Sequence, residues 1–186
     1  MDFVEVQVQR YPELAAKYEE LGSLFSRKLW HELTEVLEKF VADDSFRRGN
    51  NLEELYSEFM TKFENRLSPI KLVQIVGTIG QKFQDAQKAV TFLSSILKSP
   101  RTKLSPDATL YLSMDIAISN VELGNKDAAL TSLKESWASL STNASSETIV
   151  YSKYYYASSV YRKVSVCCAG VVLYDYPSLS FIQLFC

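Results

Sequence analysis

The sequence of 186 residues is poor in the side chains that most often build metal and redox sites. It has one histidine, His31, and three cysteines, Cys167, Cys168 and Cys186, all close to the end. A structural zinc site needs four ligands, usually Cys or His, and these residues do not supply a convincing set. Cys167 and Cys168 are also adjacent, unlike the spacing of a redox pair. We therefore expect no metal site and no cofactor.

Catalytic motifs are missing as well. A Ser-His-Asp or Cys-His site would require His31, but no G-x-S-x-G elbow accompanies it. The glycines of residues 77–82 have the wrong spacing for a phosphate-binding loop, and they end a predicted helix where such a loop should precede one. Paired carboxylates such as Glu53 and Glu54 more often face solvent than catalyse. We predict a non-catalytic protein without catalytic or cofactor-binding residues, in which His31 is structural.

Excess basic charge and long hydrophobic runs are also absent. The formal net charge of −2 argues against a nucleic-acid surface, which needs a clustered basic face. No run approaches the roughly 18 apolar residues of a transmembrane helix. The first residues, Met1–Glu5, are acidic and lack a signal-peptide pattern. We expect a protein of the cytoplasm and nucleus that binds neither nucleic acid nor membrane.

Helical periodicity is the strongest signal that the sequence contains, and it is clearest over residues 105–140. Ser105 is a good N-cap with Pro106 at the first helical position, and Gly124 suits the left-handed residue that ends a helix. A second helix follows at once, which predicts an antiparallel αα-hairpin. The apolar residues of its two arms recur at helical spacing: Tyr111, Met114, Ile118 and Val121, then Leu130, Leu133, Trp137 and Leu140. We expect Trp137 to be buried against the first arm.

Similar periodic stretches predict helices along most of the chain. They cover residues 12–25, 29–40, 51–63, 69–79, 86–97 and 147–163. The helix starts at Ser68-Pro69, Ser105-Pro106 and Ser145-Ser146 repeat with a period of about 37–40 residues, which is typical of stacked helix pairs. The sequence therefore predicts an all-α, tetratricopeptide-like solenoid of antiparallel helix pairs.

Three stretches also resemble a known family, in the same order along the chain. Residues 28–34, KLWHELT, are similar to a Lys-Leu-Trp-His-Gln-Leu-Thr signature near the start of that family's chains, with Glu32 in place of Gln. Residues 155–161, YYASSVY, resemble its aromatic-x-x-Ser-Ser-x-Tyr helix. Between them, the family's next helices are matched by Leu55, Tyr56, Phe59, Phe63, Glu64, Pro69, Leu72, Val73 and Ile75. The family is that of 26S proteasome non-ATPase regulatory subunit 13, a PCI-family lid subunit, and the resemblance covers about residues 10–163.

This resemblance implies a structural role. It implies a non-catalytic scaffold subunit of the lid of the proteasome regulatory particle, acting in ubiquitin-dependent protein degradation. The implied partners are other lid subunits, with the neighbouring ubiquitin receptor as a further candidate. The family continues into more helical repeat and a PCI domain, which this chain does not contain, so we expect it to assemble poorly. The alternatives are a scaffold subunit of another PCI complex (the COP9 signalosome or a translation initiation factor) and a generic helical-repeat adapter. An enzyme is the remote remaining class.

The composition changes near Val164. Of the charged residues only Asp175 lies in 164–186, and the segment is β-prone without a helical stripe. We predict two parts: a helical-repeat part at 1–163, and a weakly packed hydrophobic tail at 164–186 that is foreign to the family and arises as a splice or gene-model end. The alternative is a natural C-terminal strand or interfacial segment.

Overall fold

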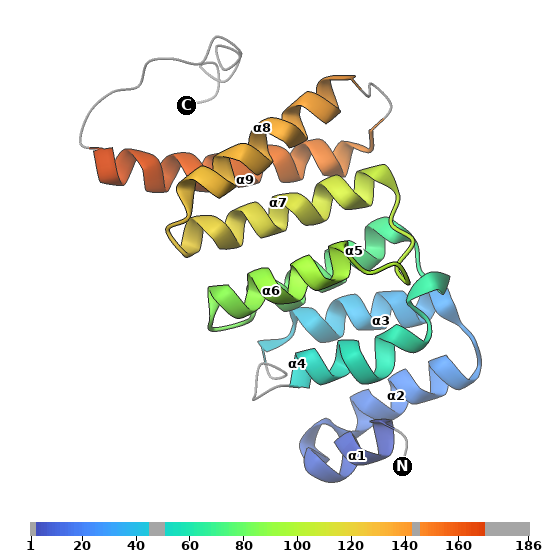
Figure 1. Ribbon diagram of the computed structural model, residues 1–186. Coiled ribbons are helices and arrows are strands. Elements are labelled where there is room, and N and C mark those ends of the chain that lie inside the picture. The colour runs from blue at the N-terminus through green and yellow to red at the C-terminus, as the bar shows by residue number, and fades with distance from the viewer. Residues whose placement is uncertain (1–2, 45–50, 143–145, 170–186) are drawn as a thin grey trace.

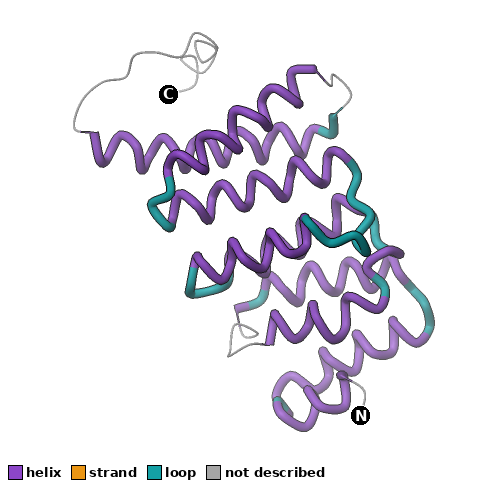
Figure 2. Tube along the Cα trace, in the orientation of Figure 1, coloured by secondary structure: helices purple, strands orange, loops and turns teal. Residues whose placement is uncertain are grey.

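The computed structural model describes residues 3–44, 51–142 and 146–169, with side chains described up to Ser165. Within these ranges the regular structure is helical and no strand occurs, so the predicted all-α class is confirmed (Figures 1 and 2). The helices are α1 (Phe3–Arg10), α2 (Ala15–Ser26), α3 (Trp30–Ala42), α4 (Asn51–Glu54), α5 (Pro69–Gln81), α6 (Ala86–Leu97), α7 (Pro106–Glu122), α8 (Lys126–Thr142) and α9 (Thr148–Ala169). None of these described helices has both the length and the apolar character needed to cross a bilayer.

The helices stack as a two-layered array that runs from α1 at one end to α8 and α9 at the other (Figure 1). One layer contains α3, α5, α7 and α9, because each of these helices contacts the next. α6 packs on α5 and α7, and α8 packs on α7 and α9, which places both in the second layer. This arrangement confirms the predicted solenoid of helix pairs, in which each pair buries its apolar faces against its neighbours.

Local signals set the ends of the central helices. The Ser105 side chain accepts a hydrogen bond from the Ala108 N–H at 3.2 Å and caps α7. Asp85 caps α6 in the same way, accepting from the Gln87 N–H at 2.8 Å. Gly124 has φ of 81°, the left-handed conformation that ends α7 and allows α8 to begin almost at once. The predicted α7–α8 hairpin is therefore confirmed.

α7 is more buried than its periodicity predicts. The expected face is in place, with Met114, Ile118 and Val121 buried and Tyr111 half-buried. Outside that face, however, Leu112, Asp115, Ala117 and Ser119 are also buried. The reason is the position of α7, which contacts α5, α6, α8 and α9 and is therefore covered on most of its circumference.

Trp137 is not buried against α7 as expected. It is half-buried and stacks on Tyr154 of α9, with ring centroids 5.2 Å apart. Helical spacing places Trp137 on the apolar side of α8, but it does not tell which neighbouring helix that side meets. Here α9 packs along α8 and supplies the aromatic partner.

Two features of the first third of the chain differ from the periodic pattern. Helix α1 was not expected, although Phe3 is only 4% exposed and stacks on Phe59 at 5.6 Å. The single helix expected at 51–63 is broken into α4, a π-helical turn at Leu55–Phe59 and a 3-10 turn at Met60–Lys62. Periodicity reports which side chains are buried, and those are indeed buried, but it does not report the hydrogen-bond ladder of the backbone.

Helix α9 continues past its expected end at Lys163 as far as Ala169. Val164 contacts the core, so an apolar side chain without helical periodicity still extends the last turns of an established helix. The expectation of β-prone structure from Val164 is therefore wrong for residues 164–169. Residues 170–186, which include Asp175 and Cys186, lie outside the described part of the chain, and the division at residue 163 stays a prediction.

Candidate functional site

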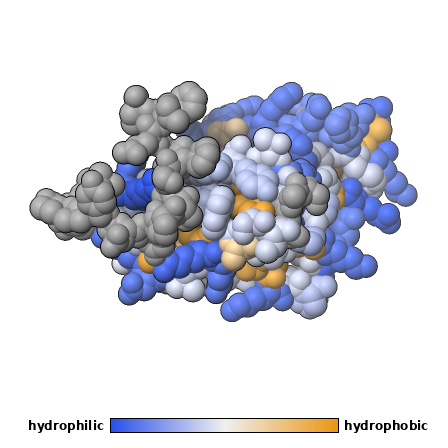
Figure 3. Space-filling view, turned by 90° about the horizontal axis from the view of Figure 1, so that it is seen from above, coloured by the Kyte–Doolittle hydropathy of each residue, from blue (hydrophilic) through white to orange (hydrophobic). Residues whose placement is uncertain are grey.

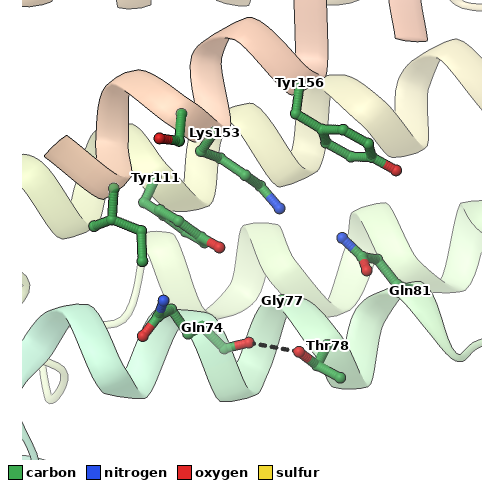
Figure 4. Close-up of a pocket in the computed structure, with 9 residues that line it drawn as sticks. Gln74, Gly77, Thr78, Gln81, Tyr111, Lys153 and Tyr156 are labelled. Carbon is green, nitrogen blue, oxygen red and sulfur yellow. Dashed lines mark hydrogen bonds between the residues drawn. The ribbon is translucent and has the colours of Figure 1, made fainter. Parts of the chain in front are cut away.

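A pocket of about 300 Å³ is lined by residues of α5, α7 and α9 (Figure 4). These three helices are neighbours in one layer, so the pocket lies on that face of the array. Its walls combine amide, hydroxyl and aromatic groups with a single charged side chain, Lys153. The lining residues are Gln74, Gly77, Thr78, Gln81, Tyr111, Ile149, Ser152, Lys153 and Tyr156.

A buried ion pair lies beside this pocket and connects its three helices. The Lys153 ammonium of α9 binds the Asp115 Oδ1 of α7, and the side chains are only 9% and 1% exposed. Gln81 of α5 donates from Nε2 to the same Oδ1 at 3.1 Å. A buried charge is costly unless it is paired and hydrogen-bonded, and these contacts meet that need while joining α5, α7 and α9.

Burial and neighbouring groups act on both members of the pair. Burial raises the pKa of the Asp115 carboxyl, while the Lys153 charge and the hydrogen bonds from Lys153 and Gln81 act in the opposite direction. The Lys153 Nζ lies 4.8 Å from the centroid of the Tyr111 ring and 5.9 Å from that of Tyr156. Cation–π attraction of this kind strengthens when the cation loses water. Two aromatic rings and one carboxylate therefore hold the ammonium at the edge of the pocket.

Gly77 permits the carboxylate to approach α5. A Cβ atom at this position would lie 2.4 Å from Asp115 Oδ2, a distance that real Cβ atoms do not show. That oxygen is buried and has no hydrogen-bond partner among the described residues. The glycine lies within α5, which runs through Gln81, so residues 77–82 form no phosphate-binding loop.

Replacing Gly77 with alanine is expected to destabilise the protein, although the same change in an exposed helix stabilises it by about 1 kcal/mol. Here the new methyl group meets a buried carboxylate, and overpacking of this kind costs about 1–3 kcal/mol. The change is measurable as the free energy of unfolding in urea. In an Asp115→Ala background the same substitution should cost less, because the colliding group is gone. A gain in stability from Gly77→Ala alone would show that the helices do not approach this closely.

Tyr111, which lines the pocket, should ionise late in an alkaline titration. Burial raises its pKa to about 12, and the Asp115 charge acts in the same direction, while a hydrogen bond with Gln74 opposes them. A tyrosine whose pKa is raised in the folded state contributes stability that is present below the unfolded pKa of 10.0 and is lost as the pH rises through about 12. The Tyr111→Phe variant should lack the corresponding step in tyrosinate absorbance. A titration curve identical to that of the wild type would contradict this assignment.

The residues singled out from the sequence lie elsewhere. His31 is on the surface, with 85% of its side chain exposed, and its Nε2 is 3.4 Å from Glu35 one turn along α3. Glu54 accepts hydrogen bonds from Arg10 at 2.8 Å and from Gln7 at 2.9 Å. Glu53 pairs with Lys88 at 2.5 Å. Within the described ranges no group of three or more His, Cys, Asp or Glu side chains could hold a metal ion.

α9 also carries the large apolar side chains that are most exposed in the described part of the chain. These are Ile149, Tyr155 and Tyr156, at 37%, 48% and 55% exposure. Ile149 and Tyr156 line the pocket, whereas Tyr155 does not and packs edge-on against Tyr154. Figure 3 looks onto the end of the array formed by α8 and α9 and shows hydrophobic patches among hydrophilic side chains there. Ile149 and Tyr156 therefore place exposed apolar surface directly at the pocket.

Comparison of the sequence with known proteins identifies a family and several relatives. The sequence model of the family described as PSD13 N-terminal repeats matches residues 17–170, which include most of α2, the whole of α3 to α9 and the pocket. The chain is 29% identical over 167 residues to 26S proteasome non-ATPase regulatory subunit 13 homolog B of Arabidopsis thaliana, covering 88% of this chain and 43% of that protein. It is 26% identical over 168 residues to 26S proteasome non-ATPase regulatory subunit 13 of Dictyostelium discoideum, covering 87% and 42%. The chain thus spans less than half the length of these relatives.

Proposed function

The chain belongs to the family of PSD13 N-terminal repeats, and from this membership we propose that it is a non-catalytic structural subunit of the lid of the 26S proteasome regulatory particle. Its role would be scaffolding and assembly in ubiquitin-dependent protein degradation, in the cytoplasm and nucleus. The observation that carries the proposal is the extent of the match, which takes in nearly all the described helices and the pocket. The curated relatives are named as proteasome regulatory subunits.

The architecture supports a scaffolding role. A stack of helix pairs offers an extended surface for protein partners, and its stability comes from contacts between neighbouring repeats. The pocket is lined by Lys153, aromatic rings and amides, and the ion pair of Lys153 with Asp115 joins α9 to α7 beside it. The proposed partners are other lid subunits and the neighbouring ubiquitin receptor. The proposed helical-repeat part, residues 1–163, contains the whole pocket.

Native affinity purification tests this proposal. The full chain, expressed with an affinity tag in eukaryotic cells, should co-purify with subunits of the proteasome regulatory particle identified by mass spectrometry. Their amount should be below stoichiometric, because we propose that this chain assembles poorly. The tag alone serves as the control. Recovery of COP9 signalosome or translation initiation factor subunits in their place would favour a different PCI complex. Recovery of neither group would contradict the proposed function.

A further inference from the structure

The pocket lining carries a single charge. Lys153 is the one charged residue among the nine that line it, and its charge is positive. The other polar lining groups are the amides of Gln74 and Gln81 and the hydroxyls of Thr78 and Ser152, with Tyr111 and Tyr156. Asp115, which neutralises Lys153 from behind, does not line the pocket. A ligand in the pocket therefore meets a cation and hydrogen-bonding groups, and no carboxylate.

Lys153 retains donors that the described residues do not use. A lysine ammonium has three N–H donors. Among the described residues Asp115 is its one hydrogen-bonding partner, and the Tyr111 and Tyr156 rings flank it at 4.8 and 5.9 Å. Figure 4 shows the Lys153 side chain extending from α9 into the space between α9 and α5. An acceptor that enters the pocket can thus bind this ammonium without breaking the contact with Asp115.

We propose that this pocket binds the carboxylate of a Glu or Asp side chain from an acidic segment of a partner protein. This inference rests on the proposed function, because it takes the partner to be a neighbouring subunit. A charge-assisted hydrogen bond from Lys153 to the carboxylate is about twice as strong as one between neutral groups. The volume of about 300 Å³ accommodates a side chain and not a folded element. A partner lysine or arginine is disfavoured, because its charge would approach that of Lys153.

The Lys153 ammonium is held in position before a ligand binds. Gln81 and the rings of Tyr111 and Tyr156 provide the contacts that do this. Gln81 fixes Asp115 from α5, so the carboxylate that orients Lys153 does not move with the ligand. The two rings restrict the ammonium from the sides. A preorganised lysine loses little side-chain entropy on binding, which raises affinity. Ile149 and Tyr156, both exposed, provide apolar contacts for the flanking residues of the segment.

Titration of the full chain with two capped peptides tests the inference. The first peptide alternates Glu with Ala, and the second has Gln in place of each Glu. The Glu peptide should bind about tenfold more tightly than the Gln peptide, because only its carboxylates form charge-assisted hydrogen bonds. Amide chemical shifts in NMR spectra should change at Ser152 and Gln81, which line the pocket. Equal affinity for the two peptides, or no binding of the Glu peptide, would overturn the proposal.

Two matched variants locate the binding site without disturbing the buried pair. Ser152→Glu places a carboxylate at the exposed rim of the pocket and should weaken binding of the Glu peptide by about tenfold through like-charge repulsion. Lys163→Gln removes an exposed cation from the same helix, outside the lining, and should leave binding unchanged. An equal loss in both variants would show non-specific attraction and overturn the proposal. Loss of peptide binding alone rejects this pocket as a carboxylate site, whereas loss of co-purification with the regulatory particle rejects the proposed function.

Discussion

Replacing Lys153 with methionine is expected to lower the free energy of unfolding by about 3–5 kcal/mol, which is the cost of leaving one member of a buried ion pair without its partner. Asp115 is 1% exposed and cannot regain water when the ammonium is removed. The hydrogen bond from Gln81 remains, but a neutral amide does not supply the lost charge. Urea denaturation followed by circular dichroism measures the effect.

Two controls separate this cause from a general effect of mutating α9. Lys163→Met removes an exposed lysine of the same helix and should change the free energy of unfolding by less than about 0.5 kcal/mol. Combining Lys153→Met with Asp115→Leu should recover much of the lost stability, because a well-packed apolar pair can replace a buried ion pair. A loss below about 1 kcal/mol in Lys153→Met would mean that water reaches Asp115 and that the pair does not hold the three helices.

Replacing Phe59 with alanine should cost about 3–5 kcal/mol, the range for truncating a fully buried aromatic side chain. Phe59 is 1% exposed, and its ring centroid lies within 5.2 to 5.6 Å of those of Phe3, Phe25 and Phe63. These partners belong to α1, α2 and the segment after α4. One truncation therefore removes contacts that join three parts of the first repeats.

Tyr155 provides the matched control for this prediction. It is an aromatic side chain in a helix but is 48% exposed, so Tyr155→Ala should change the free energy of unfolding by less than about 0.5 kcal/mol. Thermal and urea unfolding of both variants, compared with the wild type, give the difference. Equal effects at Phe59 and Tyr155 would contradict the position of Phe59 at the centre of the aromatic cluster.

Helix ends and apolar faces were predictable from the sequence because their causes are local. Ser105, Asp85 and Gly124 act through their own backbone neighbourhood, so residue type and position were sufficient to place the ends of α6 and α7. The signature at residues 28–34 has equally local roles. Lys28 takes a left-handed conformation with φ of 59° before α3, and Trp30 stacks on Phe63 at 5.9 Å. The family to which this signature pointed is the one that the comparisons identify.

The pocket could not be predicted, because its members come from three helices that are distant in the sequence. Asp115 follows Met114 within an apolar stretch, and this position was the one sequence signal that its charged side chain is buried. Nothing in the spacing identifies Lys153 as its partner, since periodicity gives the face of each helix and not the neighbour that covers it. The same gap explains Trp137, whose apolar face was predicted but whose partner, Tyr154, was not. Helix α1 was not predicted for a different reason. A helix of eight residues has too few turns to show a clear hydrophobic period in the sequence.

Sedimentation of the tagged full chain through a density gradient of cell lysate tests the central claim most directly. If the chain is a structural subunit of the proteasome regulatory particle, a fraction of it should migrate with the regulatory-particle subunits, far ahead of a free protein of 21.1 kDa. The regulatory-particle subunits in each fraction serve as internal markers and are quantified by mass spectrometry. Migration of all the soluble chain as the free protein, in a lysate whose regulatory particles remain intact, would contradict the account.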